Sequence, residues 1–205
     1  MFSYNIVLIG DSGVGKSTFF IQFFNHTFQE KSIATIGIEY HKTEMNVEGV
    51  PVIIHIYDTA GQEKYKVLTN NYYKKADGIV LMYSVEDVKS IKEIENWFTN
   101  IQEKAKKEIA IALVANKVDL PTELIKVDEE EGEMLAKTLG ISFYQISSKK
   151  YADVVNVIKG LIKELLKNED VDTISNLSKN TVRNKKGNLS LLSNKKYKNK
   201  KIKCC

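Results

Sequence analysis

Cysteine and long apolar runs are both scarce in this sequence of 205 residues. Its only two cysteines are Cys204 and Cys205, and adjacent cysteines cannot link distant segments, so the sequence predicts no disulfide framework. The longest apolar candidates, IVLI and IAIALVA, are far too short to span a bilayer. Met1 is followed by Phe2, without a basic region and a long apolar stretch, so we expect neither a secretory signal nor N-terminal myristoylation. The cytosol is then the expected compartment.

Arginine is scarce too, and the charge is unevenly distributed. Arg183 is the only arginine, so the segment 1–167 contains none. From Asn168 onward there are ten Lys or Arg and three Asp or Glu residues, a net charge of +7; because the whole chain carries +4, the preceding part carries −3. This tail is rich in Asn, Ser and Lys and cannot bury enough apolar surface to offset its ordering entropy, so we expect it to be disordered. A basic tail of this kind could also bind nucleic acid.

The segment 1–167 alternates strands rich in Val and Ile with helices. This alternation predicts βαβ units, and therefore an α/β fold with a mostly parallel six-stranded sheet and helices on both faces. A short hairpin at Glu48-Gly49 joins two strands, so one strand should run antiparallel. Ligands of such sheets bind beyond the carboxyl ends of the strands, so we looked for chemistry directly after each strand. The predicted strands are 4–9, 36–47, 50–57, 78–84, 109–115 and 141–147, and the predicted helices are 16–25, 65–76, 88–107, 128–140 and 152–167.

The first such segment is GDSGVGKS, Gly10 to Ser17, which fits the phosphate-binding pattern G-x-x-x-x-G-K-[ST] between a strand and a helix. Glycines let backbone N–H groups approach phosphate oxygens closely, and the helix N-terminus adds favourable dipole charge. Lys16 can reach the β- and γ-phosphates, and the Ser17 hydroxyl can ligate Mg²⁺. The alternative is a Gly-rich turn without a ligand, but a chance match arises in only roughly one chain in a hundred.

A second segment, NKVD at 116–119, follows the strand 109–115. The Asp119 carboxylate can accept hydrogen bonds from N1–H and the 2-amino group of guanine, whereas adenine lacks this pair of donors. A site built for that pairing rejects the wrong base strongly, because a buried carboxylate is then left unpaired. Alone the segment would be an ordinary polar turn; after a phosphate-binding loop it indicates guanine.

A third segment, DTAGQE at 58–63, follows the strand 50–57. Asp58, at the end of that strand, suits a residue that holds Mg²⁺. Gly61 can turn its N–H toward a γ-phosphate, and Gln62 can orient a water for in-line attack. Because 1–167 lacks arginine, an arginine that assists this reaction must come from a partner.

The order of GDSGVGKS, TIG, DTAGQE, NKVD and SSK resembles the Ras superfamily of small GTPases, over residues 5–167. Within it, IGIEY (36–40), YYKKA (72–76) and the terminal CC are similar to the Rab branch, which regulates membrane traffic. The resemblance implies a P-loop NTPase G domain at 1–167 and a hypervariable tail at 168–205. It also implies slow hydrolysis of GTP, with an active GTP-bound form and an inactive GDP-bound form.

The resemblance further assigns roles to single residues. Thr35 would meet Mg²⁺ and the γ-phosphate, Phe28 would pack against guanine, and the Ser147-Ser148-Lys149 segment would lie beside the base. The residues implied in catalysis are Gln62, Lys16, Thr35 and Gly61; in metal binding Ser17, Thr35 and Asp58; and in nucleotide binding Asp11, Ser12, Gly13, Val14, Gly15, Lys16, Ser17, Thr18, Phe28, Thr35, Gly61, Asn116, Lys117, Asp119, Ser147, Ser148 and Lys149.

The sequence departs from the family pattern in several places. Ser32 stands where an aromatic residue is common, and Lys64-Tyr65 stands where Arg-Phe is usual. Ser148 stands where alanine is usual, which we expect to leave the backbone N–H at that position available to guanine. The implied effector surface carries three tyrosines where Phe, Trp and Phe or Tyr are usual, so it should be more polar. This surface comprises Ile36, Gly37, Ile38, Tyr40, Tyr57 and Tyr72. Trp97, on the predicted helix 88–107, we interpret as a packing residue.

Partners follow from the same resemblance: an exchange factor, an activating protein, a dissociation inhibitor or escort protein, and effectors. We expect a monomer that binds no nucleic acid. Alternatives are a signalling switch outside membrane traffic, a nucleotide-locked scaffold, and a P-loop phosphotransferase. The phosphotransferase would need a lid with catalytic arginines, which 1–167 lacks; intact Ser17, Thr35 and Gln62 argue against the scaffold.

The terminal cysteines do not form a C-a-a-X box, because no three residues follow either of them. The resemblance implies prenylation of both Cys204 and Cys205. Stable anchoring takes two signals, which two lipid chains beside a polybasic segment would supply. We therefore expect the protein on the cytoplasmic face of an intracellular membrane, in exchange with the cytosol.

Overall fold

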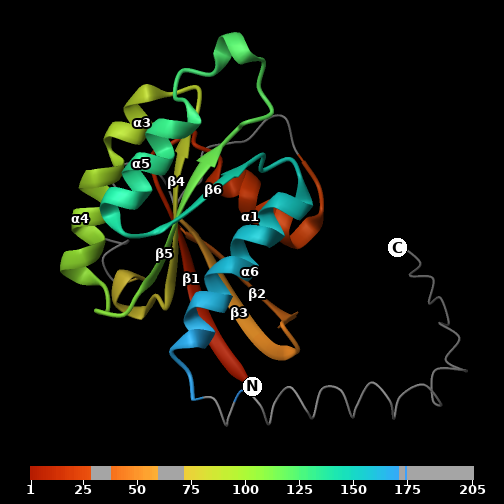
Figure 1. The fold of residues 1–205 in the computed structure, drawn as a ribbon. Coiled ribbons are helices and arrows are strands. Elements are labelled where there is room, and N and C mark those ends of the chain that lie inside the picture. Colours follow the sequence, from red (N-terminus) through yellow and green to blue (C-terminus); the bar gives the residue numbers. More distant parts are fainter. Residues whose placement is uncertain (29–37, 60–71, 171–173, 175–205) are drawn as a thin grey trace, which may run out of the picture.

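The computed structural model describes residues 1–28, 38–59, 72–170 and 174, and Figure 1 shows a central sheet flanked by helices. Six strands form this sheet in the order β2-β3-β1-β4-β5-β6. Neighbouring strands are parallel except β2 and β3, which are antiparallel and meet at the predicted hairpin. The predicted α/β fold is therefore confirmed. The strands are β1 (Phe2–Ile9), β2 (Ile38–Val47), β3 (Val50–Thr59), β4 (Gly78–Ser84), β5 (Ala110–Asn116) and β6 (Ser142–Ile146).

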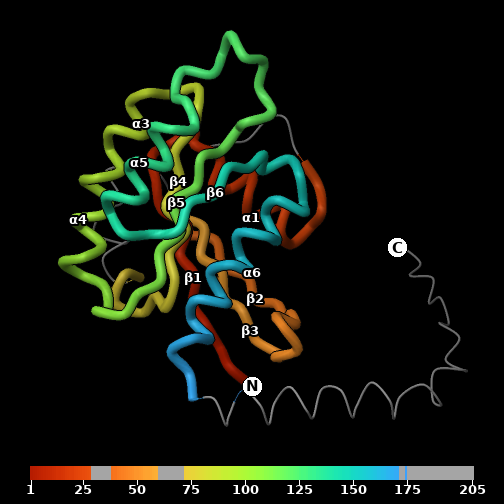
Figure 2. The backbone as a smooth tube through the Cα atoms, in the orientation of Figure 1, coloured from red at the N-terminus to blue at the C-terminus, as the bar shows by residue number. Residues whose placement is uncertain are grey.

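Two layers of helices cover the sheet, as the tube in Figure 2 shows. Helices α1 and α6 lie on one face, and α3, α4 and α5 lie on the other. Residues 72–75 are also helical. The helices are α1 (Lys16–Asn25), α3 (Val88–Lys92), α4 (Ile94–Lys104), α5 (Glu129–Leu139) and α6 (Tyr151–Lys167), with a short 3-10 turn, η2 (Thr122–Leu124).

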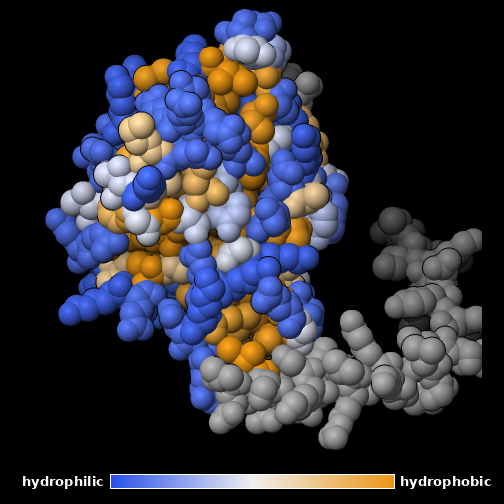
Figure 3. Space-filling view, in the orientation of Figure 1, coloured by the Kyte–Doolittle hydropathy of each residue, from blue (hydrophilic) through white to orange (hydrophobic). Residues whose placement is uncertain are grey.

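The core has two halves, one on each face of the sheet. In β1, Ile6 and Leu8 pack toward α1 and α6, while Val7 and Ile9 pack toward α4 and α5. This is the two-residue period of a strand that is buried on both faces. Figure 3 shows that the viewed surface is mostly hydrophilic, with hydrophobic residues gathered between the helices. The sheet is thus a rigid platform for the loops at its edge.

The helix predicted at 88–107 differs from the structure. It is divided into α3 and α4 at Glu93, which stays in the right-handed region but has a ψ of −10°, well above the usual helical value. Helix α4 ends before Ala105, which is extended. Beyond this end, the Lys106 ammonium lies 2.6 Å from the Asp77 carboxylate, just ahead of β4. Of the helix predicted at 65–76, the part before residue 72 lies outside the described residues.

The chain after α6 returns to the first strand. The Tyr4 hydroxyl donates to the Glu169 carboxylate at 3.0 Å, and Ile174 packs against the core on the α1 and α6 face. The rest of the predicted tail lies outside the described residues. Within the described ranges, no helix combines the length and the apolar character needed to cross a membrane.

Candidate functional site

The loop between β1 and α1 has a backbone that only glycine adopts readily. Gly10 has φ +139° and Gly15 has φ +103°, both far from the region preferred by other residues. A Cβ on Gly10 would lie 2.1 Å from the Met82 carbonyl oxygen, and one on Gly15 would lie 2.2 Å from Asn116 Nδ2. Ser12 and Gly13 are exposed, whereas Val14 is buried beneath them. The loop therefore presents its backbone at the N-terminus of α1, an arrangement that suits an anion.

Lys16 extends under this loop and is only 5% exposed. Its ammonium donates to the carbonyl oxygens of Gly10 and Asp11, each at 2.7 Å. Burial lowers the pKa of Lys16 to about 8, although the nearby carboxylates of Asp58 and Asp11 act in the opposite direction. The loop thus contains a desolvated cation, whose charge is more effective than it would be in water.

Oxygen ligands meet where β3 ends beside the start of α1. The Ser17 hydroxyl donates to Asp58 Oδ2 at 2.6 Å, and Asp58 is fully buried. The neighbouring Thr59 hydroxyl donates to the Leu8 carbonyl oxygen at 2.7 Å, which ties the end of β3 to β1. A hydroxyl and a carboxylate are the oxygen donors that Mg²⁺ prefers. The residues present therefore fit a magnesium ion, with Ser17 and Asp58 as the described members of its site.

Asn116 connects the loop Gly10–Ser17 with Ser148, in the segment predicted to lie beside the base. It is 1% exposed, at the end of β5. Its Nδ2 donates to the Val14 carbonyl at 2.7 Å, and its Oδ1 accepts the backbone N–H of Ser148 at 2.9 Å. Three segments that are far apart in the sequence are therefore held by one buried amide. The Ser148 N–H thus donates to Asn116 in this structure, and its contact with guanine stays a prediction.

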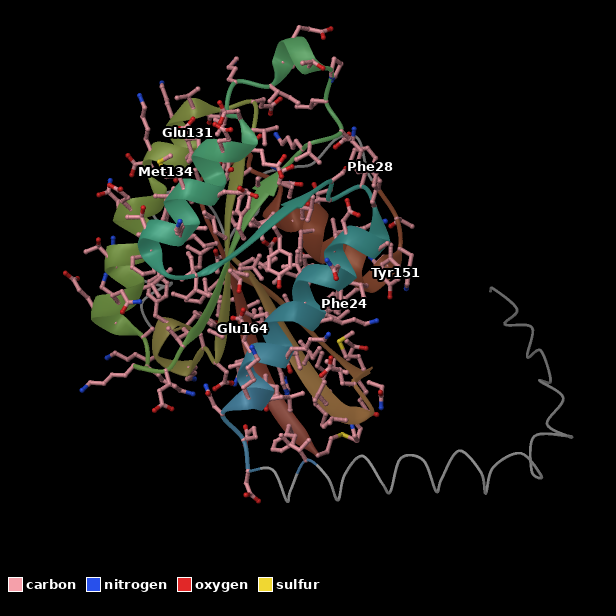
Figure 4. All side chains as sticks on the ribbon, viewed as in Figure 1. Phe24, Phe28, Glu131, Met134, Tyr151 and Glu164 are labelled. Atoms are coloured by element: carbon pink, nitrogen blue, oxygen red, sulfur yellow. The ribbon has the colours of Figure 1, made fainter. Side chains whose placement is uncertain are left out.

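Asp119 lies in a small cluster of polar groups beside Phe28. Its Oδ2 is 2.7 Å from the Lys149 ammonium, which also lies 5.2 Å from the centre of the Phe28 ring. Burial alone would raise the pKa of Asp119, but hydrogen bonds from Lys149 and Ser147 and the charge of Lys149 outweigh it, so the pKa is lowered. Asp119 is thus an ionised acceptor. Figure 4 shows Phe28 on the loop that follows α1, and the residue is 42% exposed.

Lys117 has a left-handed backbone with φ +70°, which directs the chain away from β5. Its ammonium lies 2.5 Å from the Glu86 carboxylate, in the loop that follows β4. Thr18, predicted to contact nucleotide, lies in the first turn of α1 and is half-buried. Among the described residues, the predicted phosphate-, metal- and base-binding positions other than Phe28 therefore lie at the carboxyl ends of β1, β3, β5 and β6, in the loops that follow them or in the first turn of α1.

The three tyrosines of the predicted effector surface form one row. The ring centres of Tyr40 and Tyr57 are 5.0 Å apart, and those of Tyr57 and Tyr72 are 5.2 Å apart. The Tyr40 hydroxyl is bonded to His55 at 2.7 Å, and the Tyr57 hydroxyl donates to Asn5 at 3.2 Å. Ile38 begins β2 beside this row. The hydroxyls of Tyr40 and Tyr57 are thus already bonded within the protein.

Trp97 has a contact that sequence analysis missed. Its indole N–H donates to Asp11 Oδ1 in the phosphate-binding loop at 2.8 Å. The residue also packs on the α4 side of the core, which confirms the predicted packing role. The hydrogen bond to Asp11 was not part of that prediction. The spacing between positions 11 and 97 gives no signal for this contact, because it depends on how α4 lies against the loop.

Several predicted residues lie outside the described residues, and their roles stay predictions. They are Thr35, Ile36, Gly37, Gly61, Gln62, Cys204 and Cys205. In the described ranges, no group of three or more His, Cys, Asp or Glu side chains is arranged to hold a metal. The site proposed for Mg²⁺ uses hydroxyl oxygens as well as a carboxylate.

Comparison with known proteins identifies the family to which the chain belongs. The family model described as the Ras family matches residues 5–167. The chain is 40% identical to Ras-related protein SEC4 of Saccharomyces cerevisiae over 188 residues, which cover 92% of this chain and 85% of that protein. It is 40% identical to Ras-related protein Rab-8B of Dictyostelium discoideum over 166 residues, 81% of each chain. It is 37% identical to Ras-related protein Rab-13 of Bos taurus over 163 residues, 80% of each chain.

The fold and the site define a guanine-nucleotide-binding P-loop protein, and the chain belongs to the Ras family. It is a Rab-like small GTPase, a switch in vesicle traffic that hydrolyses GTP. The resemblance inferred from the motifs alone is thereby confirmed, and a signalling role outside traffic is not favoured.

Proposed function

We propose that this chain cycles between GTP and GDP with Mg²⁺ and that the residues described above carry the cycle. The loop Gly10–Ser17 binds the phosphates, Lys16 neutralises the β- and γ-phosphates, and Asp119 reads the guanine base. One observation carries the proposal: the buried Asn116 amide bonds both to Val14 in the phosphate-binding loop and to Ser148 in the base-recognition segment. This bond pattern holds the two segments at a fixed separation. A single nucleotide could then place its phosphates on the loop Gly10–Ser17 and its base beside Ser148.

We propose that Ser17, Asp58 and Thr35 hold the metal. Mg²⁺, when bound, neutralises charge on the β- and γ-phosphates. Ser17 Oγ lies 2.6 Å from Asp58 Oδ2, which supports a shared role of the two residues in binding the metal. Thr35 is included because of the family resemblance.

The proposed hydrolysis needs two residues from DTAGQE. Gln62 orients the attacking water, and the Gly61 N–H binds the γ-phosphate. Intrinsic hydrolysis in such enzymes is slow, on the order of one event per hour, and an activating protein can add about 10³–10⁵ in rate, often through an arginine. The absence of arginine from 1–167 supports an external source for such a group. Loss of the γ-phosphate releases the contacts of Thr35 and Gly61, which changes the conformation that effectors recognise.

We further propose that the protein acts at the cytoplasmic face of an intracellular membrane. An exchange factor, an activating protein and an escort or dissociation inhibitor would regulate it there. Effectors would bind the row of Tyr40, Tyr57 and Tyr72 together with residues 36–38. Cys204 and Cys205 would carry the lipid anchors.

The substitution Asp119→Asn tests the base assignment. Guanine offers a 2-amino donor to a carboxylate, whereas xanthine offers a 2-oxo acceptor that an amide NH₂ can meet, so the variant should prefer XTP over GTP. Competition binding of the two nucleotides measures this preference. Asp128→Asn is the control, because Asp128 caps α5 away from the site and Asn caps helices about as well as Asp. A variant at position 119 that keeps the parent preference for GTP would remove Asp119 from base recognition.

A further inference from the structure

A carboxylate in a loop that binds phosphates is an electrostatic problem. Asp11 is the second residue of the loop Gly10–Ser17, and its side chain is half-buried. Its negative charge would repel a nucleotide, which carries several negative charges, and repulsion is stronger where water is partly excluded. Burial raises the pKa of Asp11, with contributions in both directions from Trp97, Glu93, Lys16 and Asp87. The loop therefore needs a means of holding this side chain away from its ligand.

The indole of Trp97 provides that means. Its N–H donates to Asp11 Oδ1 at 2.8 Å, a hydrogen bond to a group that carries charge when ionised. Trp97 lies in the first turn of α4, a helix packed against the face of the sheet opposite α1 and α6 (Figure 1). The Asp11 carboxylate is thus bonded to a helix that is rigidly packed against the core.

The backbone carbonyl of Asp11 contacts Lys16. The Asp11 carbonyl oxygen accepts from the Lys16 ammonium at 2.7 Å, as does the carbonyl oxygen of Gly10. The ammonium is therefore held by neutral carbonyls. If the carboxylate were released from Trp97, the Lys16 ammonium would be its nearest strong attraction, and an ion pair with it would compete directly with the phosphates.

We propose that Trp97 is a positioning residue for phosphate binding: it holds the Asp11 carboxylate on α4, away from the phosphates and from the Lys16 ammonium. The inference rests on the proposed binding of GTP and GDP at this loop. GTP has one more phosphate than GDP, so loss of the Trp97 contact should weaken GTP binding more than GDP binding.

A double-substitution cycle tests the proposal on the full-length chain. Trp97→Phe keeps an aromatic ring on α4 and removes the N–H, so GTP affinity should fall about tenfold, which corresponds to about 1.4 kcal/mol. GDP affinity should fall less. In the Asp11→Ala background, Trp97→Phe should change GTP affinity by less than about twofold, because there is no longer a carboxylate to hold. Phe98→Leu is the matched control, since Phe98 neighbours Trp97 and packs on the same side of the core.

The outcomes separate positioning from packing. An equal loss of GTP affinity from Trp97→Phe with and without Asp11 would show that the ring acts only through packing, and would overturn the proposal. The proposal would also fail if Trp97→Phe binds GTP as tightly as the parent, or if Phe98→Leu produces the same preferential loss of GTP. If the unsubstituted chain bound neither nucleotide, the proposed function itself would be wrong.

A second measurement needs no substitution at position 97. The chain has a single tryptophan, so its indole N–H gives one unambiguous signal in an NMR spectrum. That N–H should be protected from hydrogen exchange both before and after GTP binds, and Asp11→Ala should abolish the protection. Loss of protection on GTP binding to the parent chain, or persistence of protection in Asp11→Ala, would contradict the proposal.

Discussion

At the scale of single residues, the main feature of the site is a buried cation. Lys16 is 5% exposed and has a pKa of about 8, whereas an ordinary lysine has 10.5. Burial is the main cause, because it disfavours the charged form. Bound phosphates would favour the ammonium again and raise the pKa of Lys16. Nucleotide binding above this pKa should therefore take up a proton.

This linkage predicts the pH dependence of GTP affinity. Below about pH 8 Lys16 is already charged, and its contribution to affinity should be constant. As the pH rises above 8, affinity should fall by up to about tenfold per pH unit, until the pKa of the bound state is reached. Calorimetry in buffers of different ionisation enthalpy would measure both the affinity and the proton uptake. A constant affinity between about pH 7.5 and 9.5, without proton uptake, would contradict the prediction.

For the free chain, the contribution of Lys16 to the free energy of unfolding changes with pH in the opposite direction. Because the pKa of Lys16 is lower in the folded protein than in the unfolded chain, the unfolded chain binds more protons between pH 8 and 10.5. The contribution of Lys16 to the free energy of unfolding should therefore rise with pH in this window. The two contributions of Lys16 therefore differ in sign, so the free energy of unfolding should be measured beside GTP affinity over the same pH range.

At the scale of elements, the strands could be predicted more fully than the helix ends or the contacts between loops. The buried run GIVLMYS was predicted as 78–84 and forms β4 at the same residues. Helix α5 could be bounded at both ends, because Asp128 accepts from the Glu131 N–H and Gly140 adopts φ +68°. The break at Glu93 could not be predicted, since 88–107 has continuous helical character. The contacts of Asn116 and Trp97 with the phosphate-binding loop depend on the packing of distant elements, which no local pattern encodes.

Gly15→Ala tests the junction between the phosphate-binding loop and α1. The left-handed backbone should cost roughly 1–2 kcal/mol for any residue with a Cβ. At Gly15 the added Cβ would also displace Asn116 Nδ2, which lies 2.2 Å from its position. Loss of the bond from Asn116 to Val14 should add about 1 kcal/mol or more, because the amide is buried. The free energy of unfolding should therefore fall by roughly 2–3 kcal/mol, with loss of nucleotide affinity.

Gly140→Ala supplies the matched control for this prediction. Gly140 also has a left-handed backbone, with φ +68°, but a Cβ there would meet nothing within 4 Å. The substitution should lower the free energy of unfolding only by the cost of the left-handed backbone, and it should leave nucleotide affinity unchanged. Chemical denaturation of both variants measures the difference. Equal losses of stability would mean that the contact with Asn116 contributes nothing.

At the scale of the whole molecule, the topology separates the nucleotide site from the point where the proposed tail leaves the body. The phosphate-binding loop follows β1 at its carboxyl end, whereas Glu169 is bonded to Tyr4 near its amino end. A strand of this length spans roughly 25 Å. A lipid anchor on the tail would therefore hold the body by the end that lies opposite the nucleotide. Because Glu169 and Ile174 contact the body, a tether would begin after Ile174. If residues 175–203 behaved as a random coil they would reach roughly 30 Å, which would hold both the site and the tyrosine row clear of the bilayer.

The last prediction concerns the two cysteines of the chain. We expect Cys204→Ser combined with Cys205→Ser to make the protein fully cytosolic. Each buried CH₂ contributes about 0.8 kcal/mol, but one shorter acyl chain binds only marginally, so two prenyl chains would turn a weak association into a stable one. Each tail lysine near an anionic surface adds about 1 kcal/mol. Replacing Lys200, Lys201 and Lys203 by Gln should therefore weaken membrane binding without abolishing it. Fractionation of cells measures both variants, and GTP binding by the double-serine variant verifies its fold, because neither substitution changes a residue of the proposed nucleotide site. Sedimentation of that variant with membranes would show that another part of the chain is the anchor.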